Sequence, residues 1–487
     1  MIRDRRVQLG LAALAWSLPL MVAVGAYAGQ VARRTEFADN LRLLDPSLLL
    51  GFAALTLAGP LSNGGGTELF PQEQLVAFPV RPRTTYLGSL ASAPLNLAWA
   101  TQVVALVTAG SFTVQDPTPL VVLSVVTTLA FVAFTTAAGQ AIGWWVVGLR
   151  QRRLGRVLSR SAGAVVFGGL TAIVLSGHAT ELLDRSPTTR VTIASINGAK
   201  GSWWLWAWPT LLLVAGAAVA VQLGDRATAW ALRRPSDQRG EPVTRRQHRR
   251  PLPRTHVGVL LRTDRASVWR SVPLRRGLVV LGLLPGSVAA AASTSWSSLA
   301  LLPGLVAAGA GLLFGVNAFC LDGSGGLWLS SMPHAGRASL TAKARVVAET
   351  CLAAVALTLV VAATRAKGVP TAAEVTALGA SAVATVALVV STCLRMSVTR
   401  PHKADLRGPR DAPAPPAAMA VYSLRLALST TLVGSLFVGA GASGEPAAGP
   451  VLGLLVLAWV VRSLRRTFRV FDAPATRARV IAVVASG

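Results

Sequence analysis

Residues 118–148 read TPLVVLSVVTTLAFVAFTTAAGQAIGWWVVG, and this stretch decides the fold class because it contains no charged side chain. An α-helix needs about 20 apolar residues to cross the ~30 Å hydrocarbon core of a bilayer. Inside lipid the backbone N–H and C=O groups must bond to one another, so the stretch is expected to be a helix. A β-barrel would require alternating segments of about ten residues, and these runs are longer and continuous.

Similar apolar stretches recur along the whole chain. Hydrophobic residues make up 52% of the 487, and only 14% are charged, whereas soluble domains carry about 25% charged residues. We therefore predict an all-α integral membrane protein with about twelve transmembrane helices, arranged as two related six-helix halves. The predicted spans are 8–29, 46–61, 89–111, 118–148, 161–180, 203–223, 277–296, 299–320, 346–364, 373–394, 418–440 and 447–461.

The net charge of +27 would suggest nucleic acid as a partner in a soluble protein. No nucleic-acid-binding motif accompanies the charge, and in membrane proteins lysine and arginine instead gather in cytoplasmic loops and face anionic lipids. With the N-terminus inside, the inside segments hold most of the 47 lysines and arginines. We therefore expect both termini in the cytoplasm, anionic lipids as partners and no nucleic acid.

The chain is expected to have three parts. Residues 1–223 form the first six-helix transmembrane half, 224–276 a basic cytoplasmic linker, and 277–487 the second six-helix half. The linker contains RRPSDQRGEPVTRRQHRRPLPR, a polar, proline-bearing composition that predicts an extended or partly disordered segment. In the second half, Glu349 could pair with Arg345, one helical turn earlier.

The two halves contain a matching segment at an offset of 254 residues. The segments read NGGGTELFPQEQLVAFPVRPRTTYLGS and NAFCLDGSGGLWLSSMPHAGRASLTAK, and each follows the second span of its half. The matched pairs are Asn63 with Asn317, Glu68 with Asp322, Leu75 with Leu329, Pro79 with Pro333, and Arg83 with Arg337. Equal placement in the two halves favours an internal duplication, which is common in transporters.

Each segment has a glycine-rich start with an acid, then an apolar patch, a proline and an arginine. This order is consistent with a short amphipathic helix at the cytoplasmic surface. Such a helix can rest on the lipid interface or insert into the groove of a partner protein. The sequence alone leaves these two alternatives open.

With these segments, the chain resembles the permease subunits of ABC-2 type exporters, in a form with two six-helix halves fused in one polypeptide. In that family the corresponding segment includes a coupling helix that docks on the ATP-binding subunit. The resemblance implies a permease that works with a separate ATP-binding-cassette ATPase, in two copies, and exports an unidentified amphiphilic substrate. It assigns ATPase coupling to Glu68, Phe78, Pro79, Arg81, Arg83, Asp322, Met332, Pro333 and Arg337.

The sequence shows few catalytic signatures, and neither HExxH nor GxSxG occurs. The phosphate-binding loop GxxxxGK[ST] does not occur, and INGAKGS around Lys200 is its nearest approach. The three cysteines, Cys320, Cys351 and Cys393, lack metal-ligand spacing and are expected to pack as small apolar side chains. We therefore expect no enzyme activity, catalytic residue, cofactor or metal in this chain, and any ATP hydrolysis on a partner subunit.

Polar residues inside the predicted spans are few. Asn96, Gln102 and Gln140 are candidates for lining a transport pathway, although hydrogen bonding between helices explains them equally well. An ion-coupled secondary transporter also fits twelve spans, but such carriers usually place acids in mid-membrane. A non-transporting membrane assembly factor is the third alternative. The alanine, glycine and arginine content is typical of a high-GC bacterium, which predicts the bacterial cytoplasmic membrane as the location.

Overall fold

The structure is a computed structural model. Apart from a few isolated positions, it describes residues 45–57, 81–91, 97–112, 120–150, 185–233, 253–323, 325–331, 336–403 and 413–486. These residues are helical with short connections, and their only β-type contact is an isolated bridge between Ser295 and Lys367.

Eight helices among the described residues are long and apolar enough to cross a membrane, which agrees with an all-α, multi-pass membrane protein. Two of them coincide with the fourth and sixth predicted spans, and six with the predicted spans of the second half. Shorter apolar helices, Asp45–Leu57 and Gln102–Ser111, fall on the second and third predicted spans. Most of the first and fifth predicted spans lies outside the described residues.

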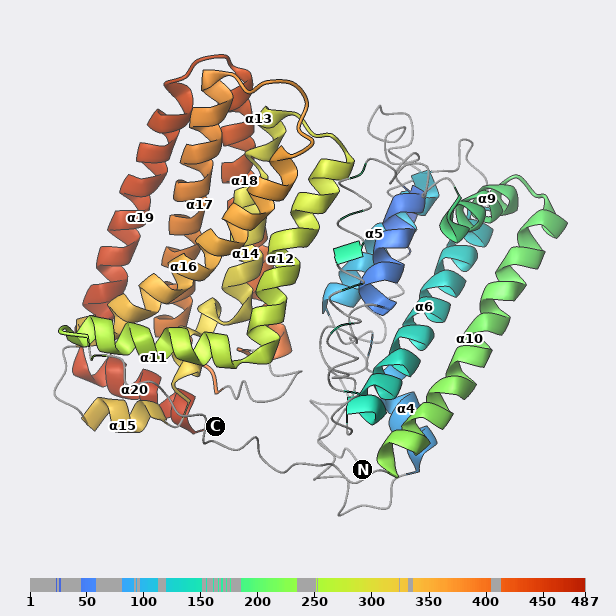
Figure 1. Ribbon diagram of the computed structural model, residues 1–487, viewed down its shortest axis with the longest axis horizontal. Coiled ribbons are helices and arrows are strands. Elements are labelled where there is room, and N and C mark those ends of the chain that lie inside the picture. The colour runs from blue at the N-terminus through green and yellow to red at the C-terminus, as the bar shows by residue number, and fades with distance from the viewer. Residues whose placement is uncertain are drawn as a thin grey trace. The chain divides into compact units, whose positions relative to one another are not determined.

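The chain divides into two compact units, residues 1–169 with 178–240 (unit 1) and residues 170–177 with 241–487 (unit 2). The named helices of unit 1 are α4 (Pro82–Ala91), α5 (Leu97–Phe112), α6 (Val121–Arg150), α9 (Pro187–Ala199) and α10 (Trp203–Leu232). Helices α6 and α10 pack side by side (Figure 1). The indole of Trp206 fixes this pair by donating to Thr127 Oγ1 at 2.9 Å.

The outer surface of α10 is apolar. It exposes Leu211, Leu212, Val214 and Val219, and more than half of each side chain is accessible. Exposure of such an apolar surface is unfavourable in water but not in the hydrocarbon core of a membrane. The composition of α10 is therefore that of a lipid-facing helix.

Unit 2 contains six long helical segments that run side by side between two ends (Figure 1). Its elements are α11 (His256–Arg270), α12 (Val272–Ala291), α13 (Trp296–Leu299), α14 (Leu302–Leu313), the 3₁₀ helix η2 (Gly315–Leu321), α15 (Gly325–Ser331), α16 (Gly336–Ala363), α17 (Ala372–Thr399), α18 (Pro416–Ala442), α19 (Ala448–Asp472) and α20 (Pro474–Ala485). Helices α11, α15 and α20 lie at one end and α13 at the other (Figure 1). We call the end with α11, α15 and α20 the basic end, because most described arginines of unit 2 lie there, whereas Arg365 and Lys367 lie at the opposite end.

Helix α11 corrects the prediction that 224–276 is an extended linker. Thr255 caps this helix, since its hydroxyl accepts a hydrogen bond from the Gly258 amide at 3.1 Å. Leu261, Asp264 and Val268 are buried and, at spacings of three and four, share one face. The prediction of an extended conformation is therefore wrong for 256–270, and also for 224–232 and 272–276, which belong to α10 and α12. Residues 234–250 lie outside the described part of the chain.

The second span of unit 2 is interrupted near the basic end, where α14 stops and η2 begins. Asn317 inside η2 has non-helical angles, φ −141° and ψ 65°. The hydroxyl of Ser397 on α17 supplies hydrogen bonds to the backbone at this interruption. It donates to Gly315 O at 3.0 Å and accepts from the Ala318 amide at 2.9 Å. Irregular backbone at membrane depth requires such partners within the protein.

Helices α17 and α19 approach closely at Gly449. A Cβ placed there would lie 2.5 Å from Ala377 Cα, so we expect Gly449→Ala to push the helices apart and to destabilise the protein by about 1–3 kcal/mol. Gly439→Ala is the matched control, because nothing lies within 4 Å of its added carbon. Thermal unfolding of the detergent-purified variants compares them, and equal melting temperatures would contradict the close-packing argument.

Candidate functional site

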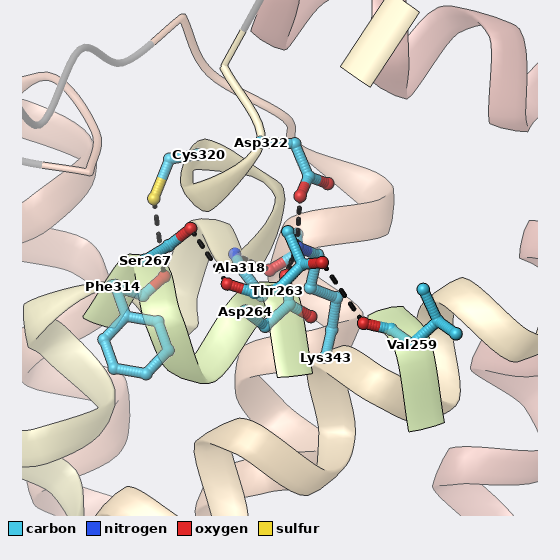
Figure 2. A network of polar contacts seen from close by, with 10 residues as sticks. Val259, Thr263, Asp264, Ser267, Phe314, Ala318, Cys320, Asp322 and Lys343 are labelled. Atoms are coloured by element: carbon cyan, nitrogen blue, oxygen red, sulfur yellow. Dashed lines mark hydrogen bonds and ion pairs between the residues drawn. The ribbon is translucent and has the colours of Figure 1, made fainter. Parts of the chain in front are cut away.

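A buried cluster of three charged side chains lies at the basic end of unit 2. The ammonium Nζ of Lys343 on α16 is 2.6 Å from Asp264 Oδ1 on α11 and 2.6 Å from Asp322 Oδ1, which precedes α15. The side chains of Lys343, Asp264 and Asp322 are only 2%, 4% and 10% exposed. Figure 2 shows the three residues converging from separate elements. We call them the Lys343 cluster.

The Lys343 cluster contains two carboxyl groups and one ammonium, so its formal charge is −1 when all three are ionised. A buried charge without a partner is costly, and protonation of a carboxyl group relieves it. Burial raises the pKa of Asp264 to about 6 against the opposing attraction of Lys343, and the nearby Asp322 carboxylate raises it further. The other oxygen of Asp264, Oδ2, is buried and has no hydrogen-bond partner among the described residues.

An aromatic pair lies beside the cluster. The Lys343 ammonium lies 6.0 Å from the ring centroid of Phe319 in η2, at the outer limit for a cation–π contact. Phe319 stacks on Phe471 of α19 with ring centroids 5.2 Å apart. The cluster therefore connects α11, α16 and the turn between η2 and α15, and it lies against an aromatic pair that reaches α19.

Two exposed ion pairs reinforce the same connections. The guanidinium of Arg265 on α11 binds both carboxylate oxygens of Glu349 on α16, at 2.7 and 2.5 Å. Arg337 at the start of α16 binds Asp472 Oδ2 at the end of α19 at 2.7 Å. The predicted pairing of Glu349 with Arg345 is therefore wrong. Helix α11 places Arg265 beside Glu349 instead.

Asn317 connects η2 to the segment between α17 and α18. Its amide Nδ2 donates to the carbonyl oxygen of His402 at 2.7 Å and to that of Pro413 at 2.8 Å. His402 Nε2 lies 3.0 Å from the Tyr422 hydroxyl on α18. Of the two residues that open the repeated segment in this half, Asn317 therefore supports the interrupted helix and Asp322 belongs to the Lys343 cluster.

Helix α15 carries the exposed apolar side chains of the predicted coupling segment. Trp328 is 71% exposed, and Leu327 is also exposed. The helix packs against α20, where Gly326 lies beside Ile481, and the guanidinium of Arg477 lies against Gly336. The apolar patch is thus held on a supported surface element between the second and third spans of unit 2.

The predicted coupling residues fall into three groups. Glu68, Phe78, Pro79, Met332 and Pro333 lie outside the described residues. Arg81 and Arg83 are exposed at the start of α4 in unit 1. Asp322 and Arg337 lie at the basic end of unit 2, where both form ion pairs.

The predicted pathway residues show no common arrangement. Asn96 lies outside the described residues, and Gln102 is half-buried in α5. Gln140 is half-buried in α6, and its side-chain oxygen is buried with no partner in the described part of the chain. One turn later, the buried Trp144 indole N–H also lacks a described partner. The unpaired polar groups of Gln140 and Trp144 are consistent with lining a transport pathway and equally with packing between helices.

Sequence reasoning did not identify Asp264 and Lys343. Lys343 is one of only four lysines and lies inside an apolar helix, which is itself a signal, because charges there are rare and usually paired. Asp264 shares the three-four spacing of Leu261 and Val268, which would have predicted an amphipathic helix. Their contact, between residues 79 apart in the sequence, depends on tertiary packing.

The site has the chemistry of a structural connection between helices. All three cysteines are buried, and among the described residues no group of three or more His, Cys, Asp or Glu side chains could hold a metal.

Comparison with known protein families, curated proteins and solved structures finds no match to this chain.

Proposed function

We propose that this chain is the transmembrane permease subunit of an ATP-binding-cassette exporter in the bacterial cytoplasmic membrane. Twelve spans form two related six-helix halves, with both termini and the basic end of unit 2 in the cytoplasm. A separate ATPase, in two copies, binds at the cytoplasmic side and drives an amphiphilic substrate outward. The chain itself needs no cofactor and binds no nucleic acid.

The placement of α15 is the observation that carries this proposal. This short helix lies between the second and third spans of unit 2, at the end rich in arginine, and it exposes Trp328. A large exposed aromatic side chain on a supported helix is suited to a pocket in a partner protein. The lipid interface, the alternative contact for such a helix, would require no ATPase.

The ion pairs of the basic end supply a route for coupling. A force on α15 reaches α11 and α16 through Asp322 and the Lys343 cluster, and the Arg337–Asp472 pair connects α16 with α19. In this proposal, closure of the ATPase subunits moves α15, and these contacts move the spans. Positive charge at the same end favours the cytoplasmic side.

Removal of the exposed aromatic side chain tests the proposal. An affinity-tagged full-length chain, extracted from its native membranes in mild detergent, is expected to bring an ATP-binding-cassette ATPase with it. Trp328→Ala should reduce the amount recovered about tenfold or more, since a buried interface tryptophan is typically a dominant contact. Val369→Ala, at an exposed position at the opposite end of unit 2, should leave recovery unchanged.

The control for folding is the yield and melting temperature of each variant, which exposed positions should hardly alter. Absence of any ATPase from the wild-type preparation would contradict the proposal. Undiminished recovery with Trp328→Ala would remove α15 from the interface.

A further inference from the structure

Helix α11 has a second face whose side chains are exposed in the described part of the chain. Leu261, Asp264 and Val268 point into unit 2, whereas Val259, Arg262, Trp269 and Arg270 are exposed. Arg262 stands three residues after Val259 and seven before Trp269, so these three share one side of the helix. We call the exposed residues Val259, Arg262, Trp269 and Arg270 the outer face of α11.

The outer face combines the two chemistries found at a membrane surface. Trp269 is 66% exposed and lies three residues before the first residue of α12, a candidate membrane span. Tryptophan prefers the boundary between headgroups and hydrocarbon, where its ring is apolar and its N–H remains hydrated. Arginine presents a planar fork of donors that fits a phosphate group.

The charge of this face is not compensated within the described part of the chain. The described acids at the basic end are already engaged, Asp264 and Asp322 by Lys343, Glu349 by Arg265, and Asp472 by Arg337. Arg262 donates to the carbonyl oxygen of Pro251 at 3.0 Å, which leaves its positive charge without a carboxylate. An external anion is therefore the complementary ligand.

We propose that the outer face of α11 binds the headgroup of an anionic phospholipid in the leaflet next to the basic end. Arg262 and Arg270 contact the phosphate region, and Val259 and Trp269 lie at the upper acyl boundary. The orientation of α11 supports this, since it runs across the ends of the spans rather than along them (Figure 1). The lipid helps hold α11, and with it Asp264, against α16. This inference rests on the membrane placement and is independent of the ATPase.

A fluorescent reporter beside the outer face tests the proposal. Thr263→Cys places an exposed thiol on α11, and the three native cysteines are buried, so a bimane label attaches selectively. The full-length protein is reconstituted in phosphatidylcholine nanodiscs that contain brominated phosphatidylglycerol or, in parallel, brominated phosphatidylcholine at the same level. Brominated phosphatidylglycerol is expected to quench the label several-fold more strongly.

The variants separate the electrostatic and apolar contributions. Arg262→Gln with Arg270→Gln should lower the preference for phosphatidylglycerol roughly tenfold or more, because each arginine near an anionic surface contributes about fivefold. Trp269→Ala should reduce quenching by both lipids. Lys367→Gln, an exposed lysine at the opposite end of unit 2, should change neither.

Two results would overturn the proposal, namely equal quenching by the two brominated lipids or an undiminished preference in the double arginine variant. Loss of quenching when a co-purified ATPase is added would assign the face to a protein partner instead. Failure to find an ATPase would leave the lipid preference measurable, so the two proposals fail separately.

Discussion

Lys343→Met is expected to destabilise the protein by about 3–5 kcal/mol, the typical cost of removing one partner from a buried ion pair. Methionine keeps the apolar stem of the lysine but removes the charge between Asp264 Oδ1 and Asp322 Oδ1, each 2.6 Å from Nζ. Two carboxylates would then share a buried site without a cation. One or both must take up a proton or move towards water, and α11 would loosen from α16.

Unfolding of the detergent-purified protein by SDS titration measures this loss. Lys367→Met is the matched control, because Lys367 is exposed at the opposite end and should change stability by less than about 0.5 kcal/mol. The triple variant with Asp264→Asn and Asp322→Asn should recover part of the loss, since neutral amides cost less to bury than carboxylates left without a cation. A wild-type unfolding midpoint in the single variant would show that the cluster does not hold these helices together.

The membrane spans of unit 2 were predictable because lipid imposes a simple requirement on each one. A helix such as α17 needs an apolar length and a helix start, and Thr371 with Glu374 forms the capping box that provides the start. The chain from 277 to 461 contains six such stretches, and each corresponds to a candidate span. Neither property depends on what the helix packs against.

The candidate site was less predictable because its residues meet through tertiary packing. Asp322 stood out from the sequence as part of a repeated segment, but its partner Lys343 lies in the next helix and Asp264 lies in a stretch predicted to be a linker. Proline and arginine around 224–276 dominated that prediction and obscured the short periodic pattern of α11. Glu349 shows the same difficulty, since local spacing suggested Arg345 and the fold supplied Arg265.

Asp264→Asn is expected to have the opposite effect to Lys343→Met, and its size should depend on pH. The carboxyl group has its pKa raised by burial to about 6, from an ordinary value of 3.8. The folded protein therefore binds a proton more tightly than the unfolded chain. The destabilisation caused by this group is absent below about pH 4, grows as the pH rises from about 4 to about 6, and is constant at higher pH. Above that range the ionised group disfavours folding by up to about 3 kcal/mol.

Asparagine removes this destabilisation because it carries no charge at any pH. Its side-chain oxygen can still accept a hydrogen bond from the Lys343 ammonium, which then has Asp322 as its one charged partner. Relative to wild type, Asp264→Asn should thus gain about 1 kcal/mol of stability between pH 5 and pH 8, with most of the gain below pH 7. SDS titration of both proteins across this range gives the difference directly and cancels the titration of other groups. A constant or falling difference would mean that Asp264 stays ionised throughout, and the cluster would then hold its negative charge without taking up a proton.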